Sequence, residues 1–294
     1  MKSSPFLRHL EQKLRERFGN DCRIESSEPV FGGSINEGFL LRCNHQLQLF
    51  LKRNESPFAA DLFKKEASGL QALRNIPDVN IPEVLFHESF SDFAYLLMEF
   101  VPVGTPNIAH WEALGRMLAQ VHRQQHTAFG LDEDNFIATL PQYNTPDASW
   151  AEFYMTQRLE PLARQALDEN KISKDLYERF QKCYTRLSEI LPSELPSLLH
   201  GDFWSGNQLC GENQVPYLID PAVYYGHREM DLAMTRLFGG FHDKFYKAYH
   251  EAYPLNSDWE KRVEICQLYP LLVHTVLFGN PYPRMIAGIL RKWE

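Results

Sequence analysis

The sequence predicts an α+β fold of two lobes, a small β-rich N-terminal lobe and a larger, mainly helical C-terminal lobe. Before Gly104, apolar residues alternate along short segments that come in pairs, which is typical of antiparallel hairpins. After Gly104, apolar residues recur mostly at helical spacing. We therefore expect an N-terminal lobe over residues 1–101 and a C-terminal lobe over residues 102–294.

Two helices and two hairpins are predicted for the N-terminal lobe. The opening stretch MKSSPFLRHLEQKLRERF has no apolar signal core and predicts an amphipathic helix. Asp61–Arg74 predicts a second helix, because Leu62, Glu66 and Leu70 fall on one face. The predicted strand pairs are Phe39–Cys43 with Leu47–Leu51, around Asn44-His45, and Val84–Phe90 with Phe93–Val101, around Ser91-Asp92.

The C-terminal lobe is predicted to be helical around one loop-rich block, His200–Asp231. Helical spacing starts at Trp111 and runs to His122. The later predicted helical segments are Trp150–Leu167, Ile172–Ile190, Asp243–Ala252 and Asp258–Phe278. The change of character indicates a hinge near Glu99–Gly104, and clefts between lobes are common ligand sites.

Composition excludes several classes of partner. The net charge is −8 and the sequence has no long Lys/Arg run, so binding to nucleic acid or to an anionic membrane is not expected. The longest apolar stretch, Leu268–Phe278, is too short to span a bilayer. The five cysteines are scattered and lack CxxC spacing, which predicts reduced thiols, no zinc site and a cytoplasmic protein. The oligomeric state is not determined by these features.

The most informative segment is HGDFWSGNQLCGENQVPYLID, His200–Asp220. Asn207 follows Asp202 by five positions, and Asp220 ends a short strand-like segment. Such oxygen-bearing side chains at strand ends can hold Mg²⁺ and orient a hydroxyl toward a phosphate. We predict Asp202 as the catalytic base, and Asn207 and Asp220 as the metal ligands. Capping of turns is the alternative for each residue alone, but the protein-kinase catalytic loop has the same Asp-to-Asn interval, so an ATP-dependent kinase is favoured.

Lys52 and Glu66 form a second predicted pair. Lys52 follows the strand Leu47–Leu51 and shares the face of Phe50. Glu66 lies on the apolar face of its helix, where a carboxylate is costly unless it is paired. We expect an ion pair that directs the Lys52 ammonium at nucleotide phosphates. The alternative is that Glu66 bends out to solvent.

Two further segments are predicted to contact ATP. Gly32 and Gly33, followed by Ser34, precede the first hairpin, and glycines let backbone amides approach phosphate oxygens. A simple turn is the alternative, and the sequence contains no GxxxxGK[ST] motif. Met98, Glu99, Phe100 and Val101 lie at the expected hinge, where a strand edge could bind adenine through its backbone.

Seven blocks of the chain resemble one known family. They are GGSIN (Gly32–Asn36), FLK (Phe50–Lys52), KEASGLQAL (Lys65–Leu73), DNFIATLPQ (Asp134–Gln142), LLHGDFWSGN (Leu198–Asn207), LIDPAVYYGHREMDLAMTRLFGGF (Leu218–Phe241) and LYPLLVHTVLFG (Leu268–Gly279). In this order they resemble the fructosamine kinase (ketosamine-3-kinase) family. That family belongs to the small-molecule branch of the protein-kinase-like fold.

The resemblance implies phosphorylation of a ketosamine hydroxyl, at O3, with ATP and Mg²⁺. It implies the same roles for Asp202, Asn207, Asp220, Lys52 and Glu66 as the residues themselves suggest. It also implies that Asn135, Trp204 and His274 line the sugar side, although Trp204 and His274 are also consistent with ordinary core positions. Asp231 is expected to anchor the catalytic loop.

Two departures from the family pattern are visible. Ser34 stands where several members have a cysteine, so a redox-sensitive disulfide is not expected to be retained. Val273 stands where many relatives have Asn, which predicts a differently shaped sugar pocket. The alternatives to a ketosamine kinase are a kinase of the same fold acting on another polyol or amino alcohol, as in the aminoglycoside and choline kinases, and a non-catalytic nucleotide-binding module.

Overall fold

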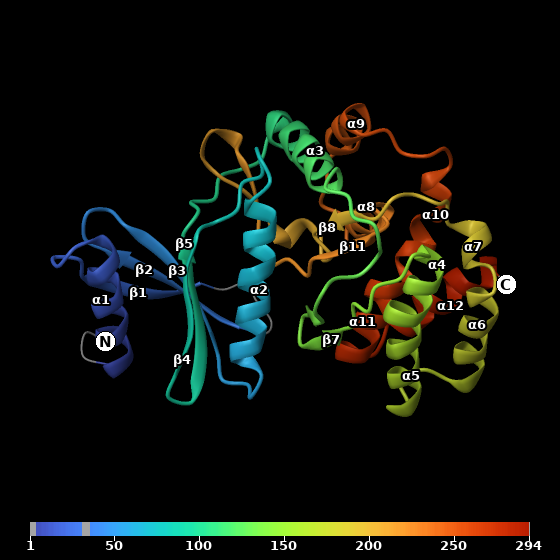
Figure 1. Cartoon of the computed structure of the whole chain (residues 1–294), viewed down its shortest axis with the longest axis horizontal. Coiled ribbons are helices and arrows are strands. Elements are labelled where there is room, and N and C mark those ends of the chain that lie inside the picture. Colours follow the sequence, from blue (N-terminus) through green and yellow to red (C-terminus); the bar gives the residue numbers. More distant parts are fainter. Residues whose placement is uncertain (1–3, 31–35, 294) are drawn as a thin grey trace.

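The computed structural model describes residues 4–30 and 36–293. Figure 1 shows a sheet-rich N-terminal part and a larger helical C-terminal part side by side. This is the predicted two-lobed α+β architecture. The glycine-loop candidates Gly32, Gly33 and Ser34 lie outside the described residues.

The N-terminal lobe is one antiparallel sheet with helices on both faces. Within residues 4–30 and 36–293 its five strands have the order β1-β2-β3-β5-β4. The strands and helices of this lobe are α1 (Pro5–Phe18), β1 (Ile24–Val30), β2 (Glu37–Cys43), β3 (Gln48–Asn54), α2 (Ala59–Arg74), β4 (Val84–Phe90) and β5 (Phe93–Glu99). Both predicted hairpins and both predicted helices are confirmed, whereas β1 is a strand that the alternation of apolar residues does not predict. β3 runs on through Lys52 to Asn54, so Lys52 is inside the strand and not just beyond it.

Alternation along β5 explains how the sheet separates two cores. Tyr95 and Leu97 pack on the α1 side with Leu10 and Leu14. Their neighbours Leu96 and Met98 pack on the α2 side, in a cluster that contains Phe63. Because successive strand side chains point to opposite faces, one strand supplies both cores. Helix α2 is therefore held between the sheet and the C-terminal lobe, as Figure 1 shows.

The C-terminal lobe is mainly helical, with short two-stranded pairs that carry the loops of the site. Its helices are α3 (Ile108–His122), α4 (Trp150–Phe153), α5 (Glu160–Asp168), α6 (Lys174–Tyr184), α7 (Leu187–Ile190), α8 (Glu229–Leu237), α9 (Asp243–Ala252), α10 (Trp259–Cys266), α11 (Leu268–Phe278) and α12 (Tyr282–Trp293). Its strands are β6 (Asn135–Ile137), β7 (Leu140–Gln142), β8 (Ser197–Leu199), β9 (Gln208–Cys210), β10 (Pro216–Leu218) and β11 (Tyr224–Gly226). Short helical turns occur at η1 (Tyr154–Leu159, a π-helix), η2 (Ser205–Asn207) and η3 (Glu212–Gln214).

The predicted helical segments of this lobe are confirmed with changes at their boundaries. Trp150–Leu167 is continuous but contains the π-helical turn η1. Ile172–Ile190 divides into α6 and α7, and Asp258–Phe278 divides into α10 and α11 at Gln267. Helix α12 follows these segments and was not among the predicted elements.

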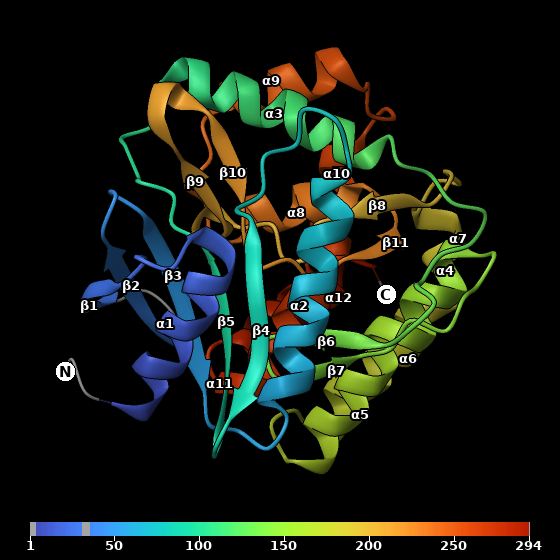
Figure 2. The same cartoon turned by 60° about the vertical axis from the view of Figure 1, so that its left-hand side comes forward.

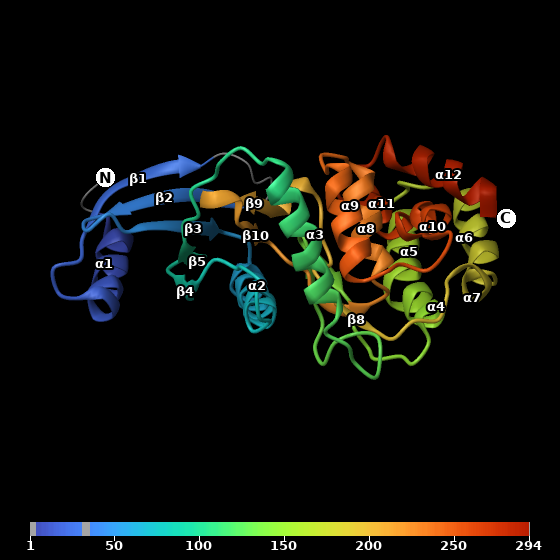
Figure 3. The ribbon, with the colours of Figure 1, turned by 90° about the horizontal axis from the view of Figure 1, so that it is seen from above.

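The hairpin of β9 and β10 connects the two lobes at the hinge. The Leu218 N–H donates to Asn80 O and Asn80 Nδ2 donates to the Pro216 carbonyl, each over 3.1 Å. Just after the hinge, the Gly104 N–H donates to the Cys210 carbonyl over 2.7 Å. In Figures 2 and 3 this hairpin lies between the sheet and α3. Since Asn207 precedes β9 and Asp220 follows β10, the hinge contacts also fix the place of both predicted metal ligands.

No helix among the described residues is both long and apolar enough to cross a bilayer.

Candidate active site

A cavity of about 770 Å³ lies between the lobes and collects most of the predicted site residues. It is lined from the N-terminal lobe by Lys52, Glu66, Met98, Glu99, Phe100 and Val101, and from the C-terminal lobe by Asn135, Asp202, Trp204, Asn207, Asp220 and His274. Of the predicted site residues, only Gly32, Gly33 and Ser34 lie outside the described part of the chain. The structure therefore brings side chains from positions 52 to 274 around one space.

Asp202, Asn207 and Asp220 lie together at one end of the β9–β10 hairpin. Asn207 Nδ2 donates to both the main-chain oxygen and Oδ2 of Asp202, each over 2.9 Å. Asn207 Nδ2 is also 3.5 Å from the Asp220 carbonyl oxygen. One amide thus links the predicted base to the loop of the second predicted metal ligand.

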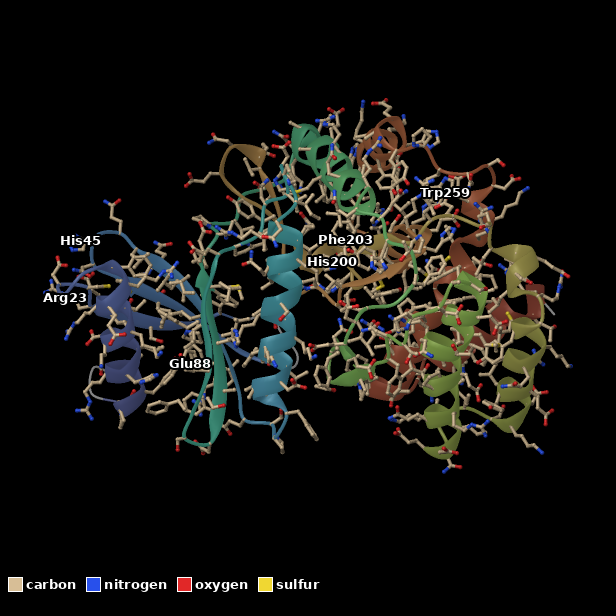
Figure 4. The ribbon with its side chains drawn as sticks, viewed as in Figure 1. Arg23, His45, Glu88, His200, Phe203 and Trp259 are labelled. Carbon is tan, nitrogen blue, oxygen red and sulfur yellow. The ribbon has the colours of Figure 1, made fainter. Side chains whose placement is uncertain are left out.

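The backbone around Asp202 is held against the segment that follows Asp220. Gly201 has φ +84°, and a Cβ built on it would lie 2.0 Å from the Ala222 carbonyl oxygen. The Ala222 N–H donates to the His200 carbonyl over 2.8 Å. The His200 ring nitrogen Nε2 lies 2.9 Å from the Ile219 carbonyl, so it carries the proton and donates. Because of this φ and the close Ala222 carbonyl oxygen, only glycine fits at position 201. Figure 4 shows His200 and Phe203 between α2 and the helices of the C-terminal lobe.

Asp231, in the first turn of α8, anchors the loop that carries Asp202. Its two carboxylate oxygens accept from the His200 N–H over 2.7 Å and the Gly201 N–H over 2.9 Å. His122 Nε2 lies 3.1 Å from Asp231 Oδ2. Asp231 is buried, and these partners compensate its charge, as a buried carboxylate requires. The anchoring role predicted for Asp231 agrees with this geometry.

Burial raises the pKa of Asp202 to about 7. The hydrogen bond from Asn207 opposes this rise in pKa, whereas the negative charge of Asp220 adds to it. A carboxyl group with a pKa near neutrality can both accept and release a proton at physiological pH. The position of Asp202 thus suits proton transfer better than a permanently ionised surface aspartate would.

Lys52 connects the two lobes electrostatically. Its Nζ lies 2.7 Å from Glu66 Oε1 and also contacts Asp220 Oδ1. Burial disfavours the ammonium, but the charges of Asp220 and Glu66 outweigh burial and raise the Lys52 pKa. Burial raises the Glu66 pKa, and Lys52 opposes that rise. The predicted Lys52–Glu66 ion pair is present, and Glu66 does not bend out to solvent.

The hinge segment Met98–Val101 borders the cavity beside the Lys52–Glu66 ion pair. Phe50 and Lys52 lie on one face of β3 and both line the cavity, as alternation predicted. The Glu99 N–H donates to Glu83 O over 2.8 Å, and the Phe100 N–H donates to Gln48 O over 3.3 Å. These bonds hold the edge of the hinge in an extended form next to Val101.

The three residues predicted for the sugar side differ in their surroundings. Asn135 is buried, donates to Val223 O, and accepts from Gln142 and Asn144, each over 2.8 Å. Trp204 is part of the cavity wall and half-exposed. His274 Nδ1 lies 2.8 Å from the Pro270 carbonyl, so Nδ1 carries the proton, and burial lowers the pKa of this ring. Asn135 thus shapes the cavity wall from within the protein, while Trp204 and His274 face the cavity.

Comparison with known proteins gives the family. A family model described as fructosamine kinase matches residues 6–293. A Lactiplantibacillus plantarum protein named "probable ketoamine kinase" is 38% identical over 275 residues, covering 92% of this chain and 95% of the relative. The chain belongs to the fructosamine kinase family.

Two more members show how far the likeness extends. The chloroplastic protein-ribulosamine 3-kinase of Arabidopsis thaliana is 34% identical over 280 residues, covering 92% of this chain and 83% of the relative. A crystal structure of a protein named as a fructosamine-3-kinase from Thermobifida fusca matches with a TM-score of 0.85 and 32% identity, over 96% of this chain and 97% of that one. The predicted protein-kinase-like fold is confirmed, and a kinase of the aminoglycoside or choline type is not favoured.

One polar network beside the cavity is not predicted by the local sequence pattern. Tyr269 Oη donates to Gln142 Oε1 over 2.8 Å, and Gln142 Nε2 donates to Ala222 O over 3.0 Å. Arg158 is fully buried and donates to Asn144 Oδ1 over 2.7 Å. The block DNFIATLPQ contains Asn135 and Gln142, but Tyr269 on α11 lies 127 positions from Gln142. Arg158 on η1 reaches the block only through Asn144, which lies 14 positions before Arg158 and donates to Asn135. The network fixes the wall of the cavity next to Ala222.

Proposed function

We propose that this protein transfers the terminal phosphoryl group of ATP to a sugar hydroxyl of a ketosamine, at O3. The observation that carries the proposal is the convergence of Asp202, Asn207, Asp220 and Lys52 on one cavity of a fructosamine kinase family member. Relatives named as ketoamine and ribulosamine kinases support the acceptor class. Phosphorylation of such adducts would serve their removal from glycated amines.

Asp202 is the proposed general base. Its carboxylate would accept the proton of the attacking hydroxyl, and its raised pKa brings it near the range in which a base works best. Asn207 orients the carboxylate through Oδ2. General-base catalysis contributes about 10²–10⁴-fold in rate.

Lys52 is the proposed contact to the nucleotide phosphates, with Glu66 holding its ammonium in place. Met98, Glu99, Phe100 and Val101 are the proposed adenine-side residues. Gly32, Gly33 and Ser34 complete the predicted ATP site but lie outside the described residues.

Asn207 and Asp220 carry the oxygen ligands that would hold Mg²⁺ together with the nucleotide phosphates. Among the described residues no group of three or more His, Cys, Asp and Glu side chains could hold a metal alone. Mg²⁺ in kinases uses one or two protein oxygens together with substrate phosphates, which matches this pair. Asp220 keeps 42% of its side chain exposed, so an oxygen is accessible from the cavity. Mg²⁺ held by these residues would supply charge neutralisation at the transferred phosphate.

The proposal is tested by measuring ADP formation from ATP with fructosamines and ribulosamines, with and without a magnesium chelator. We expect turnover of at least one ketosamine and its loss on chelation. Turnover of another small alcohol with no turnover of either ketosamine would reject the acceptor. The cytoplasmic location and the lobe boundary between residues 101 and 102 are further predictions that this assay does not address.

A further inference from the structure

An aromatic row extends from the catalytic loop to the outer end of the cavity. It consists of Trp204, Phe238, His274 and Phe278, and all four line the cavity. Neighbouring ring centroids are 6.4 Å apart for Trp204 and Phe238, 4.9 Å for Phe238 and His274, and 5.6 Å for His274 and Phe278. Three separate segments therefore supply one continuous apolar surface.

Exposure changes sharply between the floor of the cavity and its outer end. Tyr224, Met230 and Tyr269 at the floor expose 1%, 5% and 4% of their surface. In contrast, Phe238 and Phe278 expose 42% and 57%. Large apolar side chains left open beside a site commonly mark surface that a ligand covers.

Among the described residues, helix α11 adds only uncharged side chains to the outer end of the cavity. They are Pro270, Val273, His274, Leu277 and Phe278. His274 donates its Nδ1 proton to Pro270, and burial lowers the pKa of its ring, which favours the neutral form. Both lysines among the described lining residues are paired, Lys52 with Glu66 and Asp220 and Lys65 with Glu133, and the lining carboxylates come from elements other than α11. This end therefore presents apolar surface to whatever reaches it.

The orientation of the acceptor follows from these two ends. With O3 at Asp202, the sugar continues in one direction, and C1 with the amine continues in the other. The closed floor can accept only a short chain end. The substituent on the amine differs in size from one ketosamine to the next, so the amine must point toward the open end of the cavity.

We propose that Phe238 and Phe278 bind the substituent carried by the ketosamine amine and make this enzyme selective for ketosamines of apolar amines. The inference rests on the proposed function and adds the chemistry of the amine side. Each methylene covered by the two rings should raise kcat/KM by about two- to fourfold until the rings are covered.

The test uses full-length enzyme and fructosamines of methylamine, propylamine, hexylamine and glycine. We expect kcat/KM to rise with alkyl length and to be lowest for the glycine adduct, whose carboxylate would meet the apolar row. Phe278→Ala should lose more activity as the alkyl group lengthens, and Phe278→Tyr should restore the length dependence. Phe18→Ala is the matched control, because Phe18 is 44% exposed on α1 and is not part of the cavity wall.

The outcomes distinguish failure of this inference from failure of the proposed function on which it rests. Turnover of all adducts without length dependence overturns the inference and leaves the proposed function standing. An equal loss for every adduct in Phe278→Ala also overturns it, because the ring would then contact the sugar. No turnover of any ketosamine rejects the proposed function and the inference together. Thermal unfolding of each variant shows that the comparison is made on folded protein.

Discussion

The Asn207 side-chain amide donates to Asp202 Oδ2 over 2.9 Å, so the proposed metal ligand also orients the proposed base. The same nitrogen donates to the Asp202 main-chain oxygen over 2.9 Å. These two bonds turn the amide nitrogen toward Asp202. Removing the donor should therefore disturb the base as well as the metal site.

Asn207→Asp tests this relationship with little change of shape. The variant replaces a donor by a second carboxylate beside Asp202, and hydrogen bonds to charged groups are worth about 1.5–3 kcal/mol. We expect kcat to fall by about 10–100-fold at saturating magnesium and ATP. Steady-state kinetics measure this, and an unchanged kcat would show that the Asn207–Asp202 contact has no catalytic consequence.

Asp202→Asn tests the base directly. The amide cannot accept the hydroxyl proton, so kcat should fall by about 10²–10⁴-fold. The ATP dissociation constant should stay within about twofold, because the base acts on the acceptor. Rapid-quench turnover and nucleotide titration separate the two quantities. Near-normal turnover would exclude Asp202 as the base.

The raised pKa of Asp202 also predicts a pH-dependent stability difference. A free aspartate titrates near about 4, whereas burial raises the folded-state pKa of Asp202 to about 7. The parent protein therefore loses stability relative to Asp202→Asn as pH rises through this window, by at most about 1.4 kcal/mol per pH unit. In metal-free and nucleotide-free buffer, the Tm advantage of the variant should grow by a few degrees between pH 5 and pH 8. The control is Asp92→Asn at an exposed turn, and an equal drift in both variants would contradict the prediction.

Lys52→Met should destabilise the protein and abolish tight nucleotide binding. Removing one partner of a buried ion pair costs about 3–5 kcal/mol, because Glu66 and Asp220 would face each other uncompensated. Lys52→Met/Glu66→Leu should recover much of the stability but none of the ATP affinity. Urea unfolding and nucleotide titration check both parts. Recovery of ATP binding in the double variant would exclude Lys52 as the phosphate contact.

Gly201→Ala should disrupt the catalytic loop. Its Cβ would lie 2.0 Å from the Ala222 carbonyl oxygen, at a φ of +84°. We expect a loss of stability of about 2 kcal/mol or more, and at least tenfold lower turnover. Gly288→Ala in α12 is the matched control, because nothing lies within 4 Å of its added Cβ. If both variants were equally stable and active, the proposed steric constraint at Gly201 would be wrong.

Most of the secondary structure was predictable because it depends on local spacing. Alternating residues gave the hairpins of β2 with β3 and β4 with β5, and helical spacing gave α2, α3 and α11. Strand β1 was missed, because its sequence IESSEPV has few apolar residues and is defined by pairing with β2. Helix boundaries at Thr185-Arg186 and Gln267 also depend on packing and not on local pattern.

The sequence by itself determined which residue types were available for phosphoryl transfer, through the short intervals of His200–Asp220 and the misfit of Glu66 on an apolar helix face. Only the tertiary structure decided how they meet. Lys52 contacts Asp220 across 168 positions, and Tyr269 reaches Gln142 across 127. The tertiary structure also decided which aromatic rings are buried at the floor of the cavity and which are exposed at its outer end. Such contacts depend on how whole elements pack, and no local spacing encodes them.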